Sequence, residues 1–500
     1  MESMSMAAER VLEGLDDDQR DAATAVEGPV RIIAGAGAGK TRTVTRRIAY
    51  ACASGAWDPD RVLAVTFSVK AAAELRSRLS ELGVGDAVTA ATFHSAALRQ
   101  LRRLWPRISG SRFPSILEDQ HDLVSRALTR VLGDEGPAAA ALRDVQAEIG
   151  WCKTNLIDPV DYPRVCDALH RLPPADLEAT RLVDVFLAYE QEKTARGRID
   201  FDDILLLAAH VLDAFPEEAA EARRGIGWLT VDEYQDVSPL QHHLLTRWLA
   251  GNRNVCVVGD PAQTIYSFAG ASGYYLLDFV REFAPLSRDV TLSRDYRSTP
   301  QVVNWANRIL SSSPDRGDYI RLSSMRDDGS RVQRTVYDTD LEEAQGVARR
   351  ILRMTDRGAR PGDFAVLSRI NGQQEVVCEA LRESGLRYRV RRDGDWRRDA
   401  VDNEAAKAAM LETLGLTGDT SAVTVSTIHA AKGLEYPHVF LVGCSEGLMP
   451  FGSPEAGERL EEERRVLYVG ATRACDTLHL SYARLADGMG GAVRAPSRFL

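Results

Sequence analysis

Short apolar runs alternate with helical patterns along much of the chain. Helical periodicity follows the first two runs, from about residue 40 and over residues 71–79. This alternation predicts parallel strands with helices on both faces of the sheet. The runs in the first half are residues 30–34, 62–67, 227–231 and 255–258.

Residues 108–198 interrupt this alternation. They are helical in period, rich in Ala, Arg and Leu, and contain few runs of strand character. We interpret them as a helical subdomain inserted into the first α/β unit. That unit then comprises residues 1–107 and 199–289.

A second α/β unit is predicted over residues 290–390 and 422–500. A polar connection rich in Arg, Asp and Ala, residues 391–421, divides it and is too small to form a domain. The predicted fold class is therefore α/β, with two parallel-sheet domains and a helical insertion in the first. The strands expected in the second unit are residues 364–368, 388–390, 423–426 and 439–442.

Composition bounds the class of protein. A chain of 500 residues is too long for one hydrophobic core. Its 62 basic and 72 acidic residues give a net charge of -10, which argues against wholesale coating of nucleic acid but allows a local basic groove. The seven scattered cysteines form no C-x-x-C pair, so neither a disulfide framework nor a zinc site is expected.

No segment is typical of a secreted or membrane protein. Residues 1–10 lack an apolar stretch, so no secretory signal is expected. Residues 204–212 are the most apolar stretch, but they are too short to span a bilayer and are interpreted as a buried helix. The sequence therefore predicts a cytoplasmic protein with no membrane partner.

A glycine-rich turn after the first apolar run carries the clearest chemistry. Residues 34–41, A-G-A-G-A-G-K-T, fit the P-loop pattern with Ala in the first Gly position. In this pattern backbone N–H groups surround the β-phosphate, Lys40 binds the β- and γ-phosphates, and the Thr41 hydroxyl ligates Mg²⁺. The alternative is a chance Gly/Ala turn, but the order of strand, loop and helix favours a site for ATP and Mg²⁺. The small residues of the loop are Ala34, Gly35, Gly37 and Gly39.

A carboxylate pair supplies the second half of such a pocket. Asp232 and Glu233 directly follow the apolar run at residues 227–231. At the end of a strand, Asp232 is suited to hold Mg²⁺ and Glu233 to orient and deprotonate the attacking water. A solvated loop is the alternative for an isolated Asp-Glu pair, and the P-loop makes the catalytic interpretation the better one.

Further motifs resemble those of the UvrD/PcrA/Rep group of superfamily 1A DNA helicases, over nearly the whole chain. Val69 replaces the usual Asn of the family's T-F-T-N-K-A-A segment, and Asp295 replaces the Asn of its N-Y-R-S element. Eight segments in family order, besides the P-loop, make the resemblance specific. The matching segments are residues 15–19, 66–72, 92–94, 232–236, 259–266, 295–298, 427–435 and 461–474.

The resemblance implies two RecA-like motor domains that share one nucleotide. Gln19 and Tyr296 would hold the adenine, and Glu435 would meet the ribose. Arg42 would join the phosphate contacts. The residues expected at the γ-phosphate are Gln263, Arg297 and Arg473, the two arginines acting as fingers from the second domain.

The same motifs imply a track for single-stranded DNA, on which bases stack on aromatic rings. For any one aromatic residue, core packing is the alternative. Phe268 stands where many relatives carry Trp, and Ala269 where they carry Arg, which predicts weaker DNA binding or an altered step. The expected DNA contacts are Thr66, Phe67, His94, Tyr266 and Phe268.

An arginine-rich stretch and the helical insertion offer further candidate surfaces. The stretch, residues 387–398, either contacts DNA or forms a solvated face offset by three aspartates, and the solvated face is the favoured interpretation. Trp151 and Lys153 in the insertion are candidates for a DNA-facing surface. The arginines of the stretch are Arg387, Arg389, Arg391, Arg392, Arg397 and Arg398.

The large accessory insertion that relatives carry in the second motor half is replaced here by residues 391–421. The resemblance implies an ATP-dependent helicase or translocase that moves 3′ to 5′ on single strands and at single/double-strand junctions. A nucleoid-associated role in DNA repair or replication is expected, and no extra module after the last motor motif. Alternatives are a translocase that displaces proteins but unwinds poorly, an ATP-gated DNA clamp, and, least supported, a helicase–nuclease.

Overall fold

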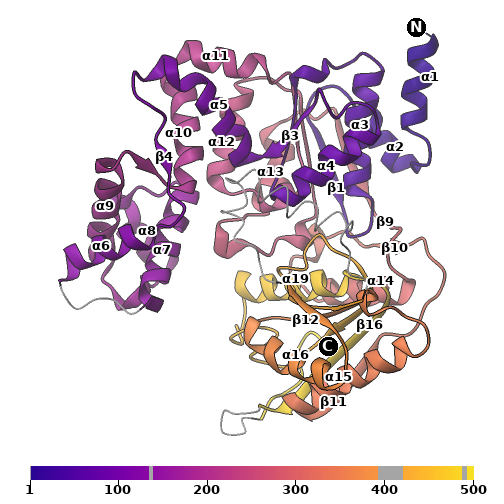
Figure 1. Cartoon of the computed structure of the whole chain (residues 1–500). Coiled ribbons are helices and arrows are strands. Elements are labelled where there is room, and N and C mark those ends of the chain that lie inside the picture. Colours follow the sequence, from indigo (N-terminus) through magenta and orange to yellow (C-terminus); the bar gives the residue numbers. More distant parts are fainter. Residues whose placement is uncertain (1, 134–138, 392–420, 487–492) are drawn as a thin grey trace.

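The structure is a computed structural model that describes residues 2–133, 139–391, 421–486 and 493–500. Two α/β lobes lie one above the other, and a group of helices stands to one side of the upper lobe (Figure 1). Most of the predicted connection at residues 391–421 lies outside the described residues, as do Arg392, Arg397 and Arg398.

The first lobe contains a six-stranded parallel sheet in the order β3-β2-β6-β7-β1-β8. All four apolar runs predicted in this half form strands, which confirms the α/β class. Strand β3 was not predicted, since T-A-A-T is short and weakly apolar. The strands are β1 (Val30–Ala34), β2 (Val62–Thr66), β3 (Thr89–Thr92), β6 (Trp228–Val231), β7 (Val255–Gly259) and β8 (Arg288–Leu292).

The sheet is buried on both faces because its strands are apolar at successive positions. On β2, Leu63 and Val65 pack into one hydrophobic cluster and Val62 and Ala64 into another, as the two-residue period of a strand requires. Helices cover both faces. They are α1 (Glu2–Val11), α2 (Asp17–Thr24), α3 (Lys40–Ala53), α4 (Val69–Glu81), α5 (Phe93–Ile108), α10 (Phe201–Ala214), α11 (Pro216–Arg224), α12 (Pro239–Leu249) and α13 (Tyr274–Glu282).

The first sheet extends further along the chain than predicted. Strand β8 pairs with β1, with Ile33 opposite Thr291 and Ala34 opposite Leu292. The predicted boundary at residue 290 falls inside this strand. The pattern R-D-V-T-L is only half apolar because β8 is an edge strand whose residues alternate between exposed and buried at its end.

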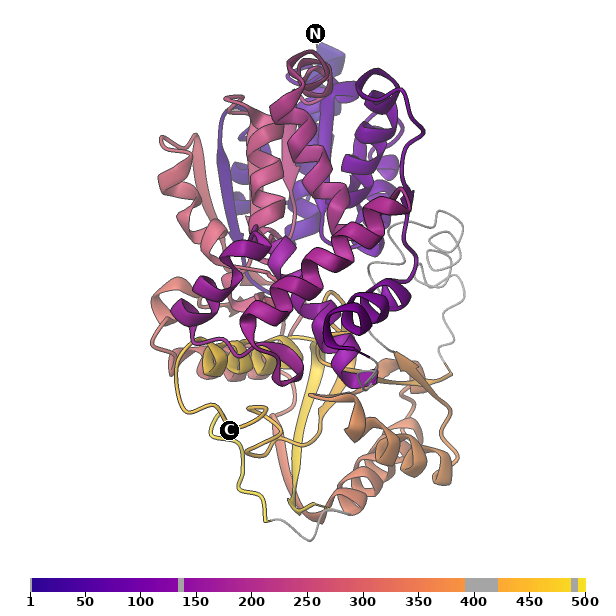
Figure 2. The same cartoon turned by 90° about the vertical axis from the view of Figure 1, so that its left-hand side faces the viewer.

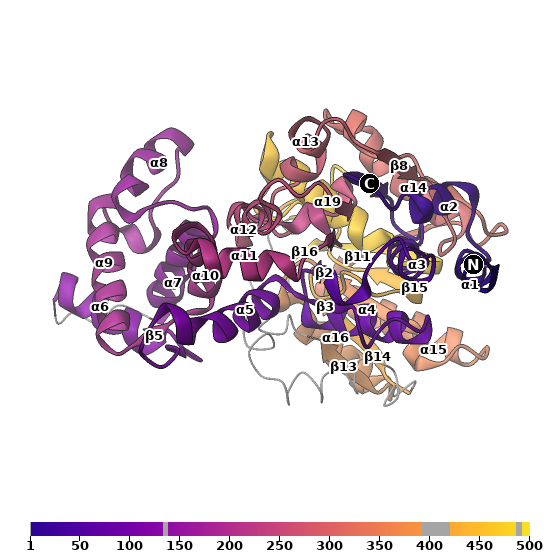
Figure 3. The same cartoon turned by 90° about the horizontal axis from the view of Figure 1, so that it is seen from above.

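The inserted segment forms a helical subdomain with its own hydrophobic cluster, which includes Leu128, Ile149 and Tyr189. In Figure 2 this subdomain faces the viewer, and in Figure 3 it projects away from the lobes. The short parallel pair β4 (Ser115–Ile116) and β5 (Arg198–Ile199) joins its two ends. Its helices are α6 (His121–Leu132), α7 (Ala139–Thr154), α8 (Tyr162–Leu169) and α9 (Ala179–Ala195).

Lys153 ties this subdomain to the first lobe instead of facing DNA. Its ammonium is buried and lies 2.5 Å from the carboxylate of Asp200 and 2.8 Å from that of Asp203. Lys193 contacts the same two carboxylates. The expectation of a DNA-facing Lys153 is wrong, because burial among paired carboxylates leaves no surface for a phosphate.

The second lobe contains another six-stranded parallel sheet, in the order β11-β16-β15-β12-β14-β13. All four strands predicted here are present, whereas β11 and β16 were not predicted. The strands are β11 (Gln333–Thr339), β12 (Phe364–Ser368), β13 (Tyr388–Arg391), β14 (Val423–Thr427), β15 (Tyr436–Leu441) and β16 (Ala474–Leu485); the helices are α14 (Pro300–Ser311), α15 (Asp340–Thr355), α16 (Gln374–Glu383) and α19 (Glu458–Ala471).

A further short parallel pair, β9 (Arg294–Asp295) and β10 (Ser323–Ser324), lies where the chain passes from the first lobe to the second. Apolar residues from both lobes share one cluster, in which Ala262 and Ile265 of the first lobe join Val466 of the second. None of the described helices combines the length and the hydrophobicity needed to cross a bilayer.

Candidate active site

The P-loop follows the carboxyl end of β1 and ends at the first turn of α3. Gly37 and Gly39 have φ angles of 71° and 79°, a left-handed conformation that favours glycine. A Cβ added at Gly37 would lie 2.1 Å from the Asp295 carboxylate, which belongs to β9. The loop therefore needs small residues both for its own conformation and because the chain leading to the second lobe packs directly on it.

Lys40 points from this loop to the carboxylate of Glu233, with 3.2 Å between the ammonium and the nearest oxygen. Burial alone would lower the pKa of Lys40, but the negative charges of Glu233, Asp260 and Asp232 outweigh it and raise that pKa. The ammonium is therefore held as a fixed positive charge where a phosphate would bind.

Asp232 and Glu233 follow β6, with the backbone N–H of Asp232 donating to the carbonyl of Val65 on the neighbouring strand. Burial and the charge of Glu233 raise the pKa of Asp232 to about 7. The buried carboxylate of Asp232 and the hydroxyl of Thr41 in the P-loop are hard oxygen donors of the kind that Mg²⁺ prefers. These two residues fit the predicted metal site.

Glu233 has the opposite titration behaviour. Although burial raises its pKa, the positive charges of Lys40 and Lys432 and the hydrogen bond from Gln235 lower it to about 2. Its φ of 54° is left-handed, which is uncommon outside glycine and typical of functional turns. Two adjacent carboxylates thus have pKa values pushed apart, a feature of sites that assign them different roles.

The two residues expected to hold adenine, Gln19 and Tyr296, both form hydrogen bonds with Asp16. Gln19 is buried, donates to the carbonyl of Ala38 at 3.0 Å, and completes a capping box with Asp16 at the start of α2. The hydroxyl of Tyr296 donates to the carboxylate of Asp16. Arg42 donates to the carbonyl of Gly14 and not to a residue of the P-loop, so its guanidinium lies near the segment that carries Gln19.

The two candidate arginine fingers lie together on the second lobe. Arg473 is buried and donates to the carbonyls of Val469 and Leu434. Burial and the neighbouring charge of Arg297 lower the pKa of Arg473 to about 10. Arg297 forms an ion pair with Glu435, with 2.6 Å between the guanidinium and the carboxylate. Glu435, which was expected at the ribose, therefore binds one of the two candidate arginine fingers.

Gln263 lies at the end of the first sheet, after β7. Its side-chain amide donates to the carboxylate of Asp260 at 2.8 Å, and its backbone carbonyl accepts from the ammonium of Lys432 at 2.6 Å. Lys432 also lies 2.5 Å from the carboxylate of Asp236. No role was predicted for Asp236, Asp260 or Lys432, although all three stand inside the matched motifs and their charge could have identified them.

Four rings form an aromatic cluster at the interface between the lobes. Phe67 stacks on Tyr266 with 5.4 Å between ring centroids, and Phe268 lies 6.0 Å from Tyr266 and 5.8 Å from His429. Phe268 is 68% exposed, an unusual environment for a large apolar side chain. This aromatic cluster, Phe67, Tyr266, Phe268 and His429, can present a ring to an unpaired base.

Two other expected DNA contacts lie below the surface. His94 is buried and stacks on Phe201 with 3.8 Å between centroids. Thr66 is the last residue of β2 and is buried as well. Both side chains are buried, because the segments that suggested them, residues 66–72 and 92–94, also contribute to the interior of the first lobe.

Comparison with models of known protein families shows the family to which the chain belongs. Residues 15–284 match the model of the UvrD/REP helicase N-terminal domain, and residues 290–401 and 403–485 match that of the UvrD-like helicase C-terminal domain. The chain belongs to the UvrD-like helicase family.

Full-length relatives in this family include the ATP-dependent DNA helicase UvrD2 of Mycobacterium tuberculosis, which is 39% identical over 99% of the chain and 82% of its own length. The ATP-dependent DNA helicase PcrA of Bacillus subtilis is 27% identical over 99% of the chain and 86% of its own length. The UvrD2 alignment covers 584 positions whereas this chain has 500 residues, so the relative carries insertions that this family member lacks.

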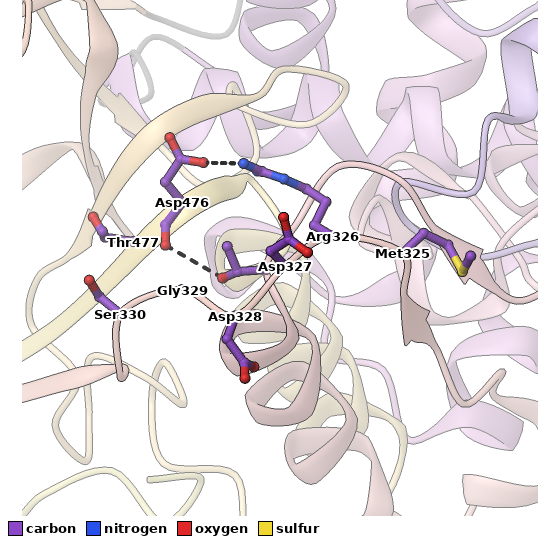
Figure 4. A pocket seen from close by; sticks show the side chains of 9 residues that line it. Met325, Arg326, Asp327, Asp328, Gly329, Ser330, Asp476 and Thr477 are labelled. Carbon is purple, nitrogen blue, oxygen red and sulfur yellow. Dashed lines mark hydrogen bonds and ion pairs between the residues drawn. The ribbon is translucent and has the colours of Figure 1, made fainter.

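An open cavity of about 430 Å³ adjoins the loop that carries Arg297, residues 295–298, which we call the finger loop (Figure 4). Arg326 crosses it to Asp476, at 2.8 Å, and donates to the carbonyl of Arg297. None of the predicted site residues lines the cavity, whose walls include Thr299, Met325 and Gly329. Arg326 therefore supports the backbone of the finger loop at Arg297.

Proposed function

We propose that this chain is an ATP-driven motor that moves along single-stranded DNA and unwinds duplex. One contact carries the proposal: the backbone N–H of Tyr296 donates to the carbonyl of Gly37, which joins the finger loop to the P-loop. Arg297 is the next residue. A pocket assembled from both lobes hydrolyses ATP only when they close, which ties turnover to their relative position.

In the proposed pocket, Lys40 and the backbone of the P-loop bind the β- and γ-phosphates. Thr41 and Asp232 hold Mg²⁺, which when bound neutralises charge on the phosphate oxygens. Glu233 orients the attacking water and accepts its proton. Once Lys40 turns to a phosphate it stabilises the Glu233 anion less, so the pKa of Glu233 rises and the carboxylate becomes a stronger base.

The second lobe completes this pocket in the proposal. Tyr296 and Gln19 hold the adenine, with Arg42 at the same end, and Gln263, Arg297 and Arg473 meet the γ-phosphate. The ion pair between Arg297 and Glu435 is partly exposed, and such pairs contribute about 0–1 kcal/mol. Arg297 can therefore leave Glu435 for a phosphate at little cost, which frees Glu435 to meet the ribose.

The proposed DNA track is the aromatic cluster. Base stacking contributes about 1–3 kcal/mol per base without sequence preference. The 3′-to-5′ polarity, the preference for single/double-strand junctions and the place in DNA repair or replication are part of the proposal and are supported by family membership alone.

A second candidate function is a translocase that displaces bound proteins but unwinds duplex poorly. It is favoured by the insertions that the relatives carry and this chain lacks. An ATP-gated clamp that does not hydrolyse ATP is disfavoured, because the chain carries the residue types that hydrolysis requires, among them Lys40, Glu233 and Arg473.

Steady-state ATP hydrolysis with and without single-stranded DNA tests the proposed function. The wild-type protein should be stimulated many-fold by DNA, and Lys40→Ala should abolish turnover while DNA binding remains. A wild-type rate of ATP hydrolysis that DNA does not change, or hydrolysis by Lys40→Ala at the wild-type rate, would contradict the proposal.

Strand displacement from duplexes with a 3′ or a 5′ single-stranded tail separates the two candidates and reports polarity. Unwinding of the 3′-tailed duplex alone supports a 3′-to-5′ helicase. Removal of a protein bound to the single strand, without strand displacement, supports the translocase.

A further inference from the structure

Three positively charged side chains, Lys70, Arg389 and Arg391, lie near one another where the two lobes meet. Lys70 lies in the first turn of α4, shortly after Phe67 of the aromatic cluster. Arg389 and Arg391 lie on β13, an edge strand of the second sheet. We call these three residues the basic cluster.

The basic cluster has no carboxylate partner among the described residues. Arg389 donates to the hydroxyl of Thr424 and Arg391 to the carbonyl of Ala430, each at 3.1 Å, and both acceptors are neutral. Glu74, one helical turn after Lys70, lies 2.6 Å from Arg78.

The positive charges of the basic cluster repel one another across the boundary between the lobes. Burial and the positive charge of Arg391, with a smaller contribution from Arg389, lower the pKa of Lys70 to about 8 against the opposing charge of Glu74. Like charges at this spacing are unfavourable in the protein alone, and a bound anion removes the repulsion.

The basic cluster adjoins the aromatic cluster on both lobes. On the first lobe, the α4 segment that carries Lys70 begins after Phe67, which stacks on Tyr266. On the second lobe, Arg391 is bonded to the carbonyl of Ala430, the residue that follows His429. Cations beside stacking rings are the combination that holds a single strand, since the rings take bases and the cations take phosphates.

We propose that Lys70, Arg389 and Arg391 bind backbone phosphates of the DNA strand whose bases stack on the aromatic cluster. The inference rests on the proposed function and adds to it a phosphate-binding edge shared by both lobes. Lys70 is on the first lobe and the two arginines are on the second. Closing the lobes around ATP therefore changes the distance between these cations and hence how tightly they bind the DNA backbone.

The proposal takes the alternative interpretation of the arginine-rich stretch, DNA contact. The three aspartates on which the solvated-face interpretation depends, Asp393, Asp395 and Asp399, lie outside the described residues, whereas Arg389 and Arg391 act on the charge of Lys70. The alternation of a strand places Arg389 and Arg391 on the same face of β13.

The salt dependence of single-strand binding tests the inference. The affinity for an oligothymidylate of about 20 nucleotides is measured over a series of salt concentrations for the wild type and for Arg389→Ala, Arg391→Ala and Lys70→Ala. Each lost phosphate contact should lower the slope of log K against log salt by roughly 0.7 and weaken binding.

Arg382→Ala is the matched control, because Arg382 is exposed on α16 of the same lobe and pairs with Glu379. It should keep the wild-type slope, and Arg391→Lys should keep most of it because the charge remains. Equal losses for Arg391→Lys and Arg391→Ala, or an unchanged slope in the Arg389→Ala/Arg391→Ala double variant, would overturn the inference.

Failure of the proposed function gives a different result. A wild-type protein that neither binds the oligomer nor is stimulated by it contradicts the motor itself. A wild type that binds and is stimulated, while the double variant keeps its slope, contradicts the basic cluster alone.

Discussion

The ammonium of Lys432 lies 2.5 Å from the carboxylate of Asp236 and joins the two lobes beside the nucleotide pocket. Both side chains are more than nine-tenths buried. Burial raises the pKa of Asp236 to about 6 even though Lys432 opposes the rise. Because Lys432 also donates to the backbone carbonyl of Gln263 and lowers the pKa of Glu233, it connects the second lobe to the proposed catalytic carboxylate.

Lys432→Ala should therefore weaken the stimulation of ATP hydrolysis by DNA. Removing one partner of a buried ion pair costs about 3–5 kcal/mol, here mostly in the closed arrangement of the lobes. DNA-stimulated turnover should fall by at least about tenfold, which corresponds to 1.4 kcal/mol in the barrier. Steady-state ATPase assays with saturating DNA measure the effect.

The double variant Lys432→Ala/Asp236→Asn is the control for this pair. If the two side chains act through each other, it should be no slower than the slower single variant. Losses that simply multiply would show that Lys432 acts without Asp236.

Phe268→Ala should weaken single-strand binding by about 1–3 kcal/mol, because one exposed stacking ring is lost. Equilibrium titration with a fluorescent oligothymidylate measures the loss. Tyr274→Ala is the matched control, since Tyr274 is an exposed aromatic residue outside the aromatic cluster. Equal affinities for Phe268→Ala and the wild type would remove Phe268 from the track.

Glu343→Gln should change the pH dependence of stability in the second lobe. Burial raises the pKa of Glu343 to about 7, although hydrogen bonds from Ser481 and Gly443 oppose the rise. The folded protein therefore binds this proton more tightly than the unfolded chain, and wild-type stability falls as pH rises between about 4.5 and 7.

The Gln variant cannot ionise and should not share this loss. The free energy of unfolding of the variant minus that of the wild type should increase between about pH 4.5 and 7, by on the order of 3 kcal/mol, and then stay constant. Urea denaturation at several pH values measures the difference. A difference that stays constant from pH 5 to pH 8 would show that burial does not perturb Glu343 as described.

The sequence predicts central strands better than edge strands. A strand buried on both faces, such as β2 or β7, is a continuous apolar run. The edge strands β8 and β11 alternate buried or half-buried residues with exposed ones, so neither was identified and the boundary between the lobes fell inside β8. The central strand β16 was also missed, because polar residues such as Asp476 and Thr477 break its apolar pattern.

For the candidate site as well, features formed by a short segment of sequence were predicted, whereas contacts between residues far apart in the chain were not. The P-loop and the Asp232–Glu233 pair are short segments whose chemistry is readable from their own residues and from a preceding strand. The contact between Lys432 and Asp236 joins residues 196 positions apart, and periodicity cannot show such a pairing. The burial of His94 and Lys153 was missed for a related reason, because it depends on how α10 packs against both.

The most direct test of the two-lobe pocket is the rate of ATP hydrolysis by Arg473→Ala, compared with its affinity for ATP. If Arg473 stabilises the departing γ-phosphate, DNA-stimulated turnover should fall by roughly 10³-fold or more while the Kd for ATP changes little. Arg484→Ala, which removes an exposed arginine from the same lobe, should turn over normally. Turnover by Arg473→Ala at the wild-type rate would contradict a pocket completed by the second lobe.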